Sequence, residues 1–140
     1  MMVNPGRLRA LVVDDNIHAR AIGVLSLRKL GIGPVEEAGD GAEALLRLMS
    51  DPFGLVLMDW YMPDINGAGL LRVLRDPRFG PAYRTPVILM TGYPSDANMA
   101  QARSLGISEI LPKPFSVDHL SAALGRVLTS PRSGGTVAYV

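Results

Sequence analysis

The sequence predicts an α/β fold in which helices cover both faces of a parallel β-sheet. Apolar segments typical of strands alternate with segments of helical periodicity five times within about 125 residues. Residues 55–58 are apolar at every position, as expected of a strand that is buried on both faces. With 140 residues and 48% apolar content, the chain is long enough for one domain with a substantial core.

The first strand is expected at residues 8–13. Asn16 should cap the helix that follows, because its side-chain oxygen can accept backbone N–H groups at a helix start. Gly31 and Gly33 mark the end of this helix. The apolar residues that recur along it at helical spacing are Ile17, Ala21, Val24, Leu25 and Leu30.

Residues 34–38 form a short, polar strand candidate, and this polarity predicts a position at the edge of the sheet. Asp40 and Glu43 have the spacing of a capping box, so a second helix should begin there and stop before Pro52. Its predicted apolar face consists of Ala42, Leu45, Leu46 and Met49.

The central strand at residues 55–58 leads directly into Asp59. Pro63 cannot continue a central strand, so Asp59 should lie at the carboxyl end, where open α/β sheets bind ligands. We therefore interpret Asp59 as a chemically active group. Trp60, the neighbouring residue, is expected to be half-exposed.

A third helix is expected before Pro77, with Leu70, Leu71 and Leu74 on its apolar face. A polar connection then leads to a buried strand at residues 86–90.

Ser95 should cap a fourth helix, whose apolar face is mostly alanine and should therefore dock weakly. The last strand is expected at residues 107–111, and Ser116 should cap the final helix. The side chains expected to face inward from that helix are Val117, Leu120, Leu124, Val127 and Leu128.

We expect residues 8–129 to form the domain, residues 1–7 an extension and residues 130–140 a disordered tail. A net charge of +1 gives no reason to expect nucleic acid or an anionic membrane as a partner. The chain has no cysteine, no signal-peptide pattern and no apolar run near the roughly 20 residues that span a bilayer. The expected location is the cytoplasm.

Five polar residues follow the predicted strands and should meet at one edge of the sheet: Asp14, Asp15, Asp59, Thr91 and Lys113. Carboxylates at about 5 Å repel one another by roughly 3 kcal/mol per pair at an effective dielectric of 20, and one lysine offsets only part of this. Oxygen ligands without histidine or cysteine point to Mg²⁺. Such a site favours attack of the Asp59 carboxylate on phosphorus, which gives an aspartyl phosphate.

These residues resemble receiver domains of two-component response regulators, of the stand-alone, single-domain type. The resemblance runs from Leu8 to about Leu128. It is carried by Asp14-Asp15, Asp59-Trp60-Tyr61-Met62-Pro63 with Gly67, Thr91-Gly92 and Lys113-Pro114-Phe115, each after a predicted strand. It implies a flavodoxin-like strand order, 2-1-3-4-5, and a cis Lys113–Pro114 bond.

By this resemblance Asp59 is the phosphoacceptor. Asp14 and Asp15 would form an acidic pocket, so that the metal site consists of Asp14, Asp15, Asp59 and the backbone carbonyl of Tyr61, with Asp15 and Asp59 on the Mg²⁺ itself. Thr91 and Lys113 would bind the phosphoryl group, with Thr91 acting as a switch.

One position departs from the family pattern. Such domains usually carry Tyr or Phe three residues before the lysine, whereas this chain has Ile110. A switch in which an aromatic ring swings inward behind Thr91 is therefore in question, and Tyr93 could take over part of it.

The resemblance implies a histidine kinase or histidine phosphotransfer protein upstream and a protein target downstream. The expected output surface is the fourth helix, last strand and last helix. The chain would be no enzyme beyond catalysing its own phosphorylation and dephosphorylation.

Two other functions remain open. The first is an interaction module that is never phosphorylated, which Ile110 keeps under consideration. The second is a phosphohydrolase or nucleotide-binding enzyme. Tyr61 disfavours the hydrolase, because aspartyl-phosphate hydrolases have a second Asp there, and the turn after Asp14 lacks the glycines that bind a pyrophosphate.

Overall fold

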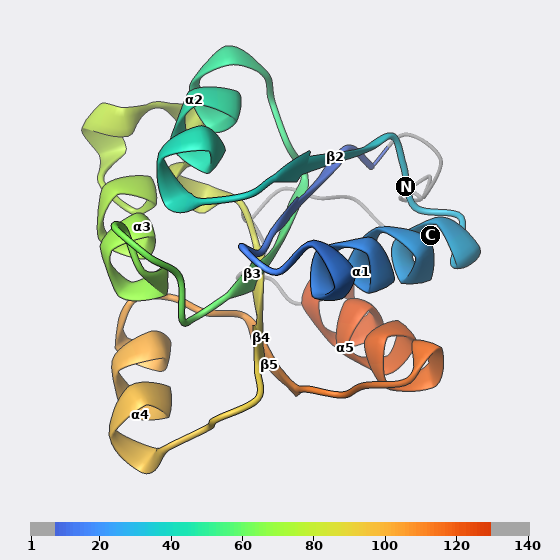
Figure 1. Cartoon of the computed structure of the whole chain (residues 1–140). Helices are drawn as coiled ribbons and strands as arrows, with labels where there is room; N and C mark the ends of the chain where they lie inside the picture. Colours follow the sequence, from blue (N-terminus) through green and yellow to red (C-terminus); the bar gives the residue numbers. More distant parts are fainter. Residues whose placement is uncertain (1–7, 130–140) are drawn as a thin grey trace.

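The computed structural model describes residues 8–129. Their five strands form one sheet in the order β2-β1-β3-β4-β5 (Figure 1). Every pair of neighbouring strands is parallel. The predicted fold class and strand order are confirmed. The extension expected at residues 1–7 and the tail expected at 130–140 lie outside the described residues.

The elements follow one another in strict alternation. The strands are β1 (Ala10–Val13), β2 (Val35–Ala38), β3 (Leu55–Asp59), β4 (Val87–Thr91) and β5 (Glu109–Pro112). The helices are α1 (Ile17–Lys29), α2 (Gly41–Ser50), α3 (Gly67–Leu74), α4 (Asp96–Ser104) and α5 (Val117–Thr129). Two short 3-10 helices, η2 (Pro77–Phe79) and η3 (Pro81–Arg84), occupy the polar connection between α3 and β4.

Two apolar layers enclose the sheet. Helices α1 and α5 cover one face, and α2, α3 and α4 cover the other (Figure 1). All residues of β1, β3 and β4 are buried, as expected of strands covered on both sides. No helix in the described part of the chain combines the length and apolar character needed to cross a membrane.

The predicted helix caps are present. The side chains of Asn16, Asp40 and Ser95 accept backbone N–H groups at the starts of α1, α2 and α4. Ser116 Oγ accepts the backbone N–H of His119 in the same way at the start of α5. Asn66 caps α3.

The apolar face predicted for α2 is wrong at Ala42, Leu46 and Met49, whereas Leu45 packs partly against the core. Leu46 and Met49 are 65% and 67% exposed, whereas Ala44 and Leu48 are buried. The helix packs closely through small residues: a Cβ on Gly41 would come within 2.8 Å of Ile65. Two of the large side chains that suggested the face, Leu46 and Met49, therefore point to solvent.

Helix α1 also differs from the expectation. Ile17 and Leu25 are 62% and 63% exposed, and the buried side is formed by Gly23, Val24, Ser26 and Leu27. A Cβ on Gly23 would lie 3.0 Å from Val12, so the absence of a side chain there lets the helix approach β1.

Strand β2 lies at the edge of the sheet, as its polarity predicts. Glu36 pairs with Arg9 at 2.9 Å and with Arg47 at 3.1 Å. Glu37 pairs with Arg20 at 3.0 Å. Glu36 and Glu37, which make the strand polar in the sequence, thus form ion pairs with arginines outside the strand.

Candidate functional site

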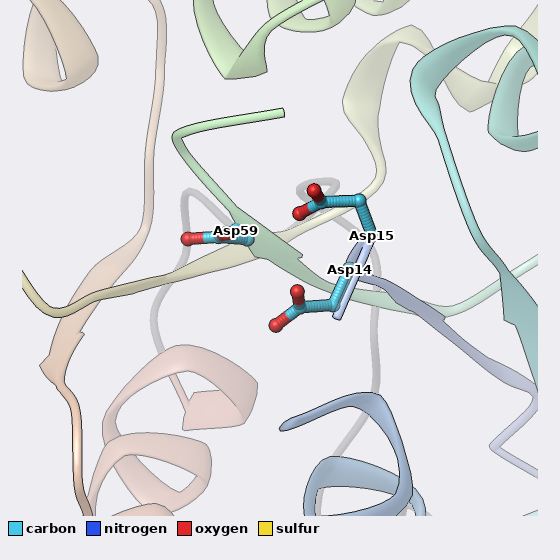
Figure 2. Close-up of side chains that lie close together, drawn as sticks. All are labelled: Asp14, Asp15 and Asp59. Atoms are coloured by element: carbon cyan, nitrogen blue, oxygen red, sulfur yellow. The ribbon is translucent and has the colours of Figure 1, made fainter. Parts of the chain in front are cut away.

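The carboxyl edge of the sheet brings together the side chains that the sequence singles out. Asp14 and Asp15 follow β1, and Asp59 is the last residue of β3. Figure 2 shows their three carboxylates converging from the ends of these two neighbouring strands. Thr91 ends β4, and Lys113 directly follows β5.

The three carboxylates form a compact acidic cluster. One oxygen from each of Asp14, Asp15 and Asp59 lies within 4.8 Å of the others. Asp14 is fully buried, Asp59 is 7% exposed, and Asp15 is open to solvent. Two of the charges are therefore poorly hydrated, and the third faces the side from which a ligand can enter.

Lys113 reaches into this cluster from β5. Its Nζ lies 2.7 Å from Asp14 Oδ2 and 3.6 Å from Asp59 Oδ1. One ammonium group faces three carboxylates, so ionised groups leave the cluster with an excess of negative charge. The peptide bond that follows, Lys113–Pro114, is cis, as the resemblance implies.

The pKa of Asp59 is raised above its ordinary value of 3.8. Burial is the largest cause, and the negative charges of Asp14 and Asp15 act in the same direction. Lys113 and the backbone N–H of Trp60 lower the pKa but do not cancel these effects. A cation that balanced the cluster would remove part of this cost.

The loop after β1 holds Asp14 in place. Asp14 Oδ1 accepts the backbone N–H of Asn16 at 2.9 Å. The backbone carbonyl of Asp14 accepts Arg20 Nη1 at 2.8 Å, and Arg20 Nε donates to Glu37. Arg20 was not predicted from the sequence, although its place one turn after the Asn16 cap is a signal for such a contact.

Thr91 is fully buried, and its Oγ1 accepts the backbone N–H of Tyr93 at 3.1 Å. Tyr93 itself is 78% exposed. Ile110 lies beside this region on β5, paired with Leu89 and packed against the core on the α4 side of the sheet.

Tyr61 connects the loop after Asp59 to its neighbours. Its hydroxyl donates to the backbone carbonyl of Tyr93 at 3.2 Å, and the two rings meet edge to face at 6.1 Å. The Nδ2 group of Asn98, on α4, donates to the same hydroxyl. Asn98 was not identified from the sequence, because an isolated helical asparagine carries no signal for a contact with a distant loop.

The expectation that Trp60 is half-exposed is wrong, since only 4% of it is exposed. Its ring packs against Gly67, where a Cβ would come within 2.9 Å of it. Its backbone N–H donates to Asp59 Oδ1 at 2.9 Å. Gly67 is therefore needed for the turn that encloses Trp60 behind the site.

The donor set fits a hard divalent cation. It consists of closely spaced carboxylate oxygens, one of them on a fully buried side chain, with too little positive charge nearby to balance them. Mg²⁺ prefers oxygen ligands of this kind and binds through one or two carboxylates. The role of the Tyr61 carbonyl as a further ligand stays a prediction.

Residues 10–125 match the family described as response regulator receiver domain. The chain is 30% identical over 122 residues to a probable chemotaxis protein CheY of Rhizobium etli, covering 86% of this chain and 92% of that protein. It is 31% identical over 120 residues to chemotaxis protein CheY-3 of Vibrio cholerae, covering 86% and 91%. The structure of CheY4 of Vibrio cholerae aligns with a TM-score of 0.77 at 29% identity, covering 91% of this chain and all of that one.

Proposed function

Because the chain belongs to the family of response regulator receiver domains, we propose that it signals through phosphorylation of Asp59. Receiver domains are modules of two-component signalling. The observation that carries the proposal is the meeting of Asp59, two further carboxylates and Lys113 at one edge of the sheet.

The proposed reaction transfers a phosphoryl group from a phosphohistidine of the donor. An Asp59 carboxylate oxygen forms a bond to phosphorus as the phosphorus–nitrogen bond breaks. The leaving imidazole keeps the electron pair of that bond and takes up a proton. Beyond this reaction and its reversal by water, the chain would convert no substrate and so would not be an enzyme in the usual sense.

In this proposal two residues bind the transferred group. The ammonium of Lys113 lies 3.6 Å from Asp59 Oδ1 and can pair with a phosphoryl oxygen. The hydroxyl of Thr91, at the end of the neighbouring strand, can donate to another.

Asp14, Asp15 and Asp59, together with the backbone carbonyl of Tyr61, would hold Mg²⁺. When bound, this cation supplies positive charge that offsets the carboxylates and the oxygens of the phosphoryl group. Asp14 keeps its contact with Lys113 and so fixes the lysine beside Asp59.

The upstream partner in this proposal is a histidine kinase or histidine phosphotransfer protein, and helix α1 offers it a surface. Ile17, Ile22 and Leu25 are each more than half exposed. Ile22 also lines a shallow pocket with Lys113, Pro114 and Phe115, next to the acidic cluster. Large apolar side chains beside a reactive group favour protein docking.

A variant of α1 distinguishes docking of the donor protein from the phosphorylation reaction itself. Ile22→Asp should slow phosphoryl transfer from the cognate donor protein at least tenfold, while a small-molecule phosphodonor still phosphorylates the variant. Leu46→Asp, at a similarly exposed site on α2, is the matched control. Equal transfer rates for the two variants would place the docking surface elsewhere.

The proposed output is a protein target that contacts α4, β5 and α5. Helix α4 buries only Met99 and Ala102, so few side chains hold it against the rest of the fold. Weakly held elements are those that shift when a nearby group changes.

The proposal is tested by incubating the protein with Mg²⁺ and a small-molecule phosphodonor and measuring its intact mass. The wild type should gain one phosphoryl group, and Asp59→Asn should gain none. Asp64→Asn, which alters an exposed carboxylate in the following loop, should behave as the wild type does. An unmodified wild type would instead support the interaction module that is never phosphorylated, for which Ile110 is the only argument.

A further inference from the structure

We propose that the Tyr61 side chain is a clasp that couples the Asp59 loop to the first turn of α4. The inference rests on the proposed function and adds to it a route by which a change at Asp59 reaches the output face. Tyr61 is a positioning residue in this role, because it acts through Tyr93 and Asn98.

The Tyr61 hydroxyl joins the loop after β3 to two adjoining segments more than 30 residues later, the loop after β4 and the first turn of α4. Tyr61 belongs to the loop between β3 and α3, Tyr93 to the loop between β4 and α4, and Asn98 to α4 itself. The hydroxyl donates to the carbonyl of Tyr93 and accepts from Asn98 Nδ2, so both of its hydrogen-bonding functions are engaged. The edge-to-face contact of the rings adds an apolar component.

Tyr93 links this clasp to the interior. Its backbone N–H is held by the buried hydroxyl oxygen of Thr91, and its backbone carbonyl is held by Tyr61. The backbone of Tyr93 is therefore held both by Thr91 and by Tyr61. A Thr91 hydroxyl that turned toward a phosphoryl group on Asp59 would give up the N–H of Tyr93 and free the loop that the clasp holds.

Few other contacts compete with the clasp at this end of α4. The helix is exposed along most of its length, and its first turn is otherwise fixed by the Ser95 cap, which accepts the N–H of Asn98. Opening the clasp leaves this turn with the cap and the buried Met99. A small change in the loop can therefore alter the position or stability of the whole turn.

The clasp also fits the residue at position 110. Ile110 is an aliphatic side chain packed against the core, with no hydroxyl to change partners. The hydroxyl that reaches across the loops in this chain belongs to Tyr61, on the same side of the sheet as α4.

Hydrogen exchange of the unphosphorylated, full-length protein tests the clasp. Asn98→Ala removes one partner of the Tyr61 hydroxyl, and Tyr61→Phe removes the hydroxyl while keeping the ring. Both should speed exchange of the Met99 and Ala100 amides by roughly fivefold, the factor that corresponds to about 1 kcal/mol for one hydrogen bond. Arg103→Ala, at an exposed site in the last turn of the same helix, should leave these amides unchanged.

The double variant should exchange little faster than either single variant, because both changes break one unit. After phosphorylation, the same amides should speed up in the wild type but gain little in Asn98→Ala, whose clasp is already open. If Asn98→Ala and Tyr61→Phe exchange at the wild-type rate, the clasp is excluded, even where the intact mass shows phosphorylation. If the wild type gains no mass, the proposed function fails, and the unphosphorylated comparison still decides whether the contact restrains α4.

Discussion

The fold holds the Asp59 carboxylate at a cost to its own stability. Its pKa is raised in the folded protein, mainly by burial, so the folded state binds a proton more tightly than the unfolded chain does. The free energy of unfolding must then fall as the pH rises from the ordinary value of 3.8 through the raised value. Above the raised pKa the ionised Asp59 destabilises the fold by its full amount, and below pH 3.8 this destabilisation is absent.

Asp59→Asn should therefore stabilise the protein at pH 7 in the absence of divalent cations, by on the order of 1 kcal/mol, the usual size of a single-site effect. Removing the charge ends both its desolvation and its repulsion by Asp14 and Asp15. Urea denaturation at a series of pH values measures the effect. The advantage of the variant should shrink as the pH falls toward 4, and a variant that is less stable at pH 7 would contradict the electrostatic interpretation.

Lys113 should contribute to stability through the buried charge that it balances. Its Nζ lies 2.7 Å from the carboxylate of Asp14, which is fully buried. Lys113→Met keeps an apolar stem but leaves that carboxylate unpaired, and we expect a loss of about 2–3 kcal/mol by chemical denaturation.

Two comparisons check this prediction. Lys29→Met changes an exposed lysine in the last turn of α1 and should have little effect. Adding Asp14→Asn to Lys113→Met should restore part of the lost stability, because no unpaired buried charge remains. Equal losses for the two lysine variants would show that the pair with Asp14 does not stabilise the fold.

At the scale of single elements, the strands were predicted more reliably than the helix faces. Strands buried on both faces, such as β3 and β4, need apolar residues along their length. Such a strand can be predicted without deciding which of its residues face the core. For a helix, the same sequence can be compatible with more than one choice of buried face. In α2 the large residues Leu46 and Met49 suggested one face, whereas the sheet accepts the side with Gly41, Ala44 and Leu48.

The residues of the candidate site divide in a similar way. Asp14, Asp59 and Lys113 could be predicted to meet because each lies at the carboxyl end of a parallel strand, and such strands end at one edge. Arg20 and Asn98 act through contacts between helices and loops, which depend on helix rotation. Trp60 was expected to be partly exposed because nothing in the sequence showed how closely Gly67 would pack against it.

Arg75, at the end of α3, connects elements that the sheet does not join directly. Its guanidinium donates to the backbone carbonyls of Tyr83, Thr85, Leu105 and Gly106 at 2.6–3.3 Å. The planar guanidinium can reach several acceptors at once, which an ammonium group cannot. Arg75 thus holds the end of α4 and the entry to β4 against α3.

Arg75→Lys should lower the free energy of unfolding by about 2–4 kcal/mol, since several partly buried carbonyls lose their donors. Thermal or chemical denaturation measures the loss. Arg72→Lys, on the exposed side of α3, is the matched control and should stay within about 0.5 kcal/mol of the wild type. A similar small change for both variants would show that water replaces Arg75 without cost.

At the scale of the whole molecule, the acidic edge should make stability depend on Mg²⁺. A ligand that binds only the folded state at one hundred times its dissociation constant stabilises it by about 2.7 kcal/mol. Titration with Mg²⁺ should therefore raise the denaturation midpoint, and a chelator should reverse the change. Asp15→Asn, which alters the exposed member of the cluster, should require more Mg²⁺ for the same shift.

Trp60 provides an independent signal for the same event. It is buried behind the site, and its backbone N–H is bonded to Asp59. Its fluorescence should change during the Mg²⁺ titration with the same midpoint as the stability shift. If Mg²⁺ changes neither the denaturation midpoint nor the Trp60 fluorescence, no metal binds at this edge.

The most direct measurement is to locate the phosphoryl group within the chain. After incubation with Mg²⁺ and a phosphodonor, borohydride reduces an acyl phosphate to an alcohol, which converts a phosphorylated aspartate to homoserine. Peptide mass spectrometry should find homoserine at position 59 and unmodified aspartate at positions 14, 15 and 64. Homoserine at another of these positions, or at none, would contradict the assignment of Asp59 as the phosphoryl acceptor.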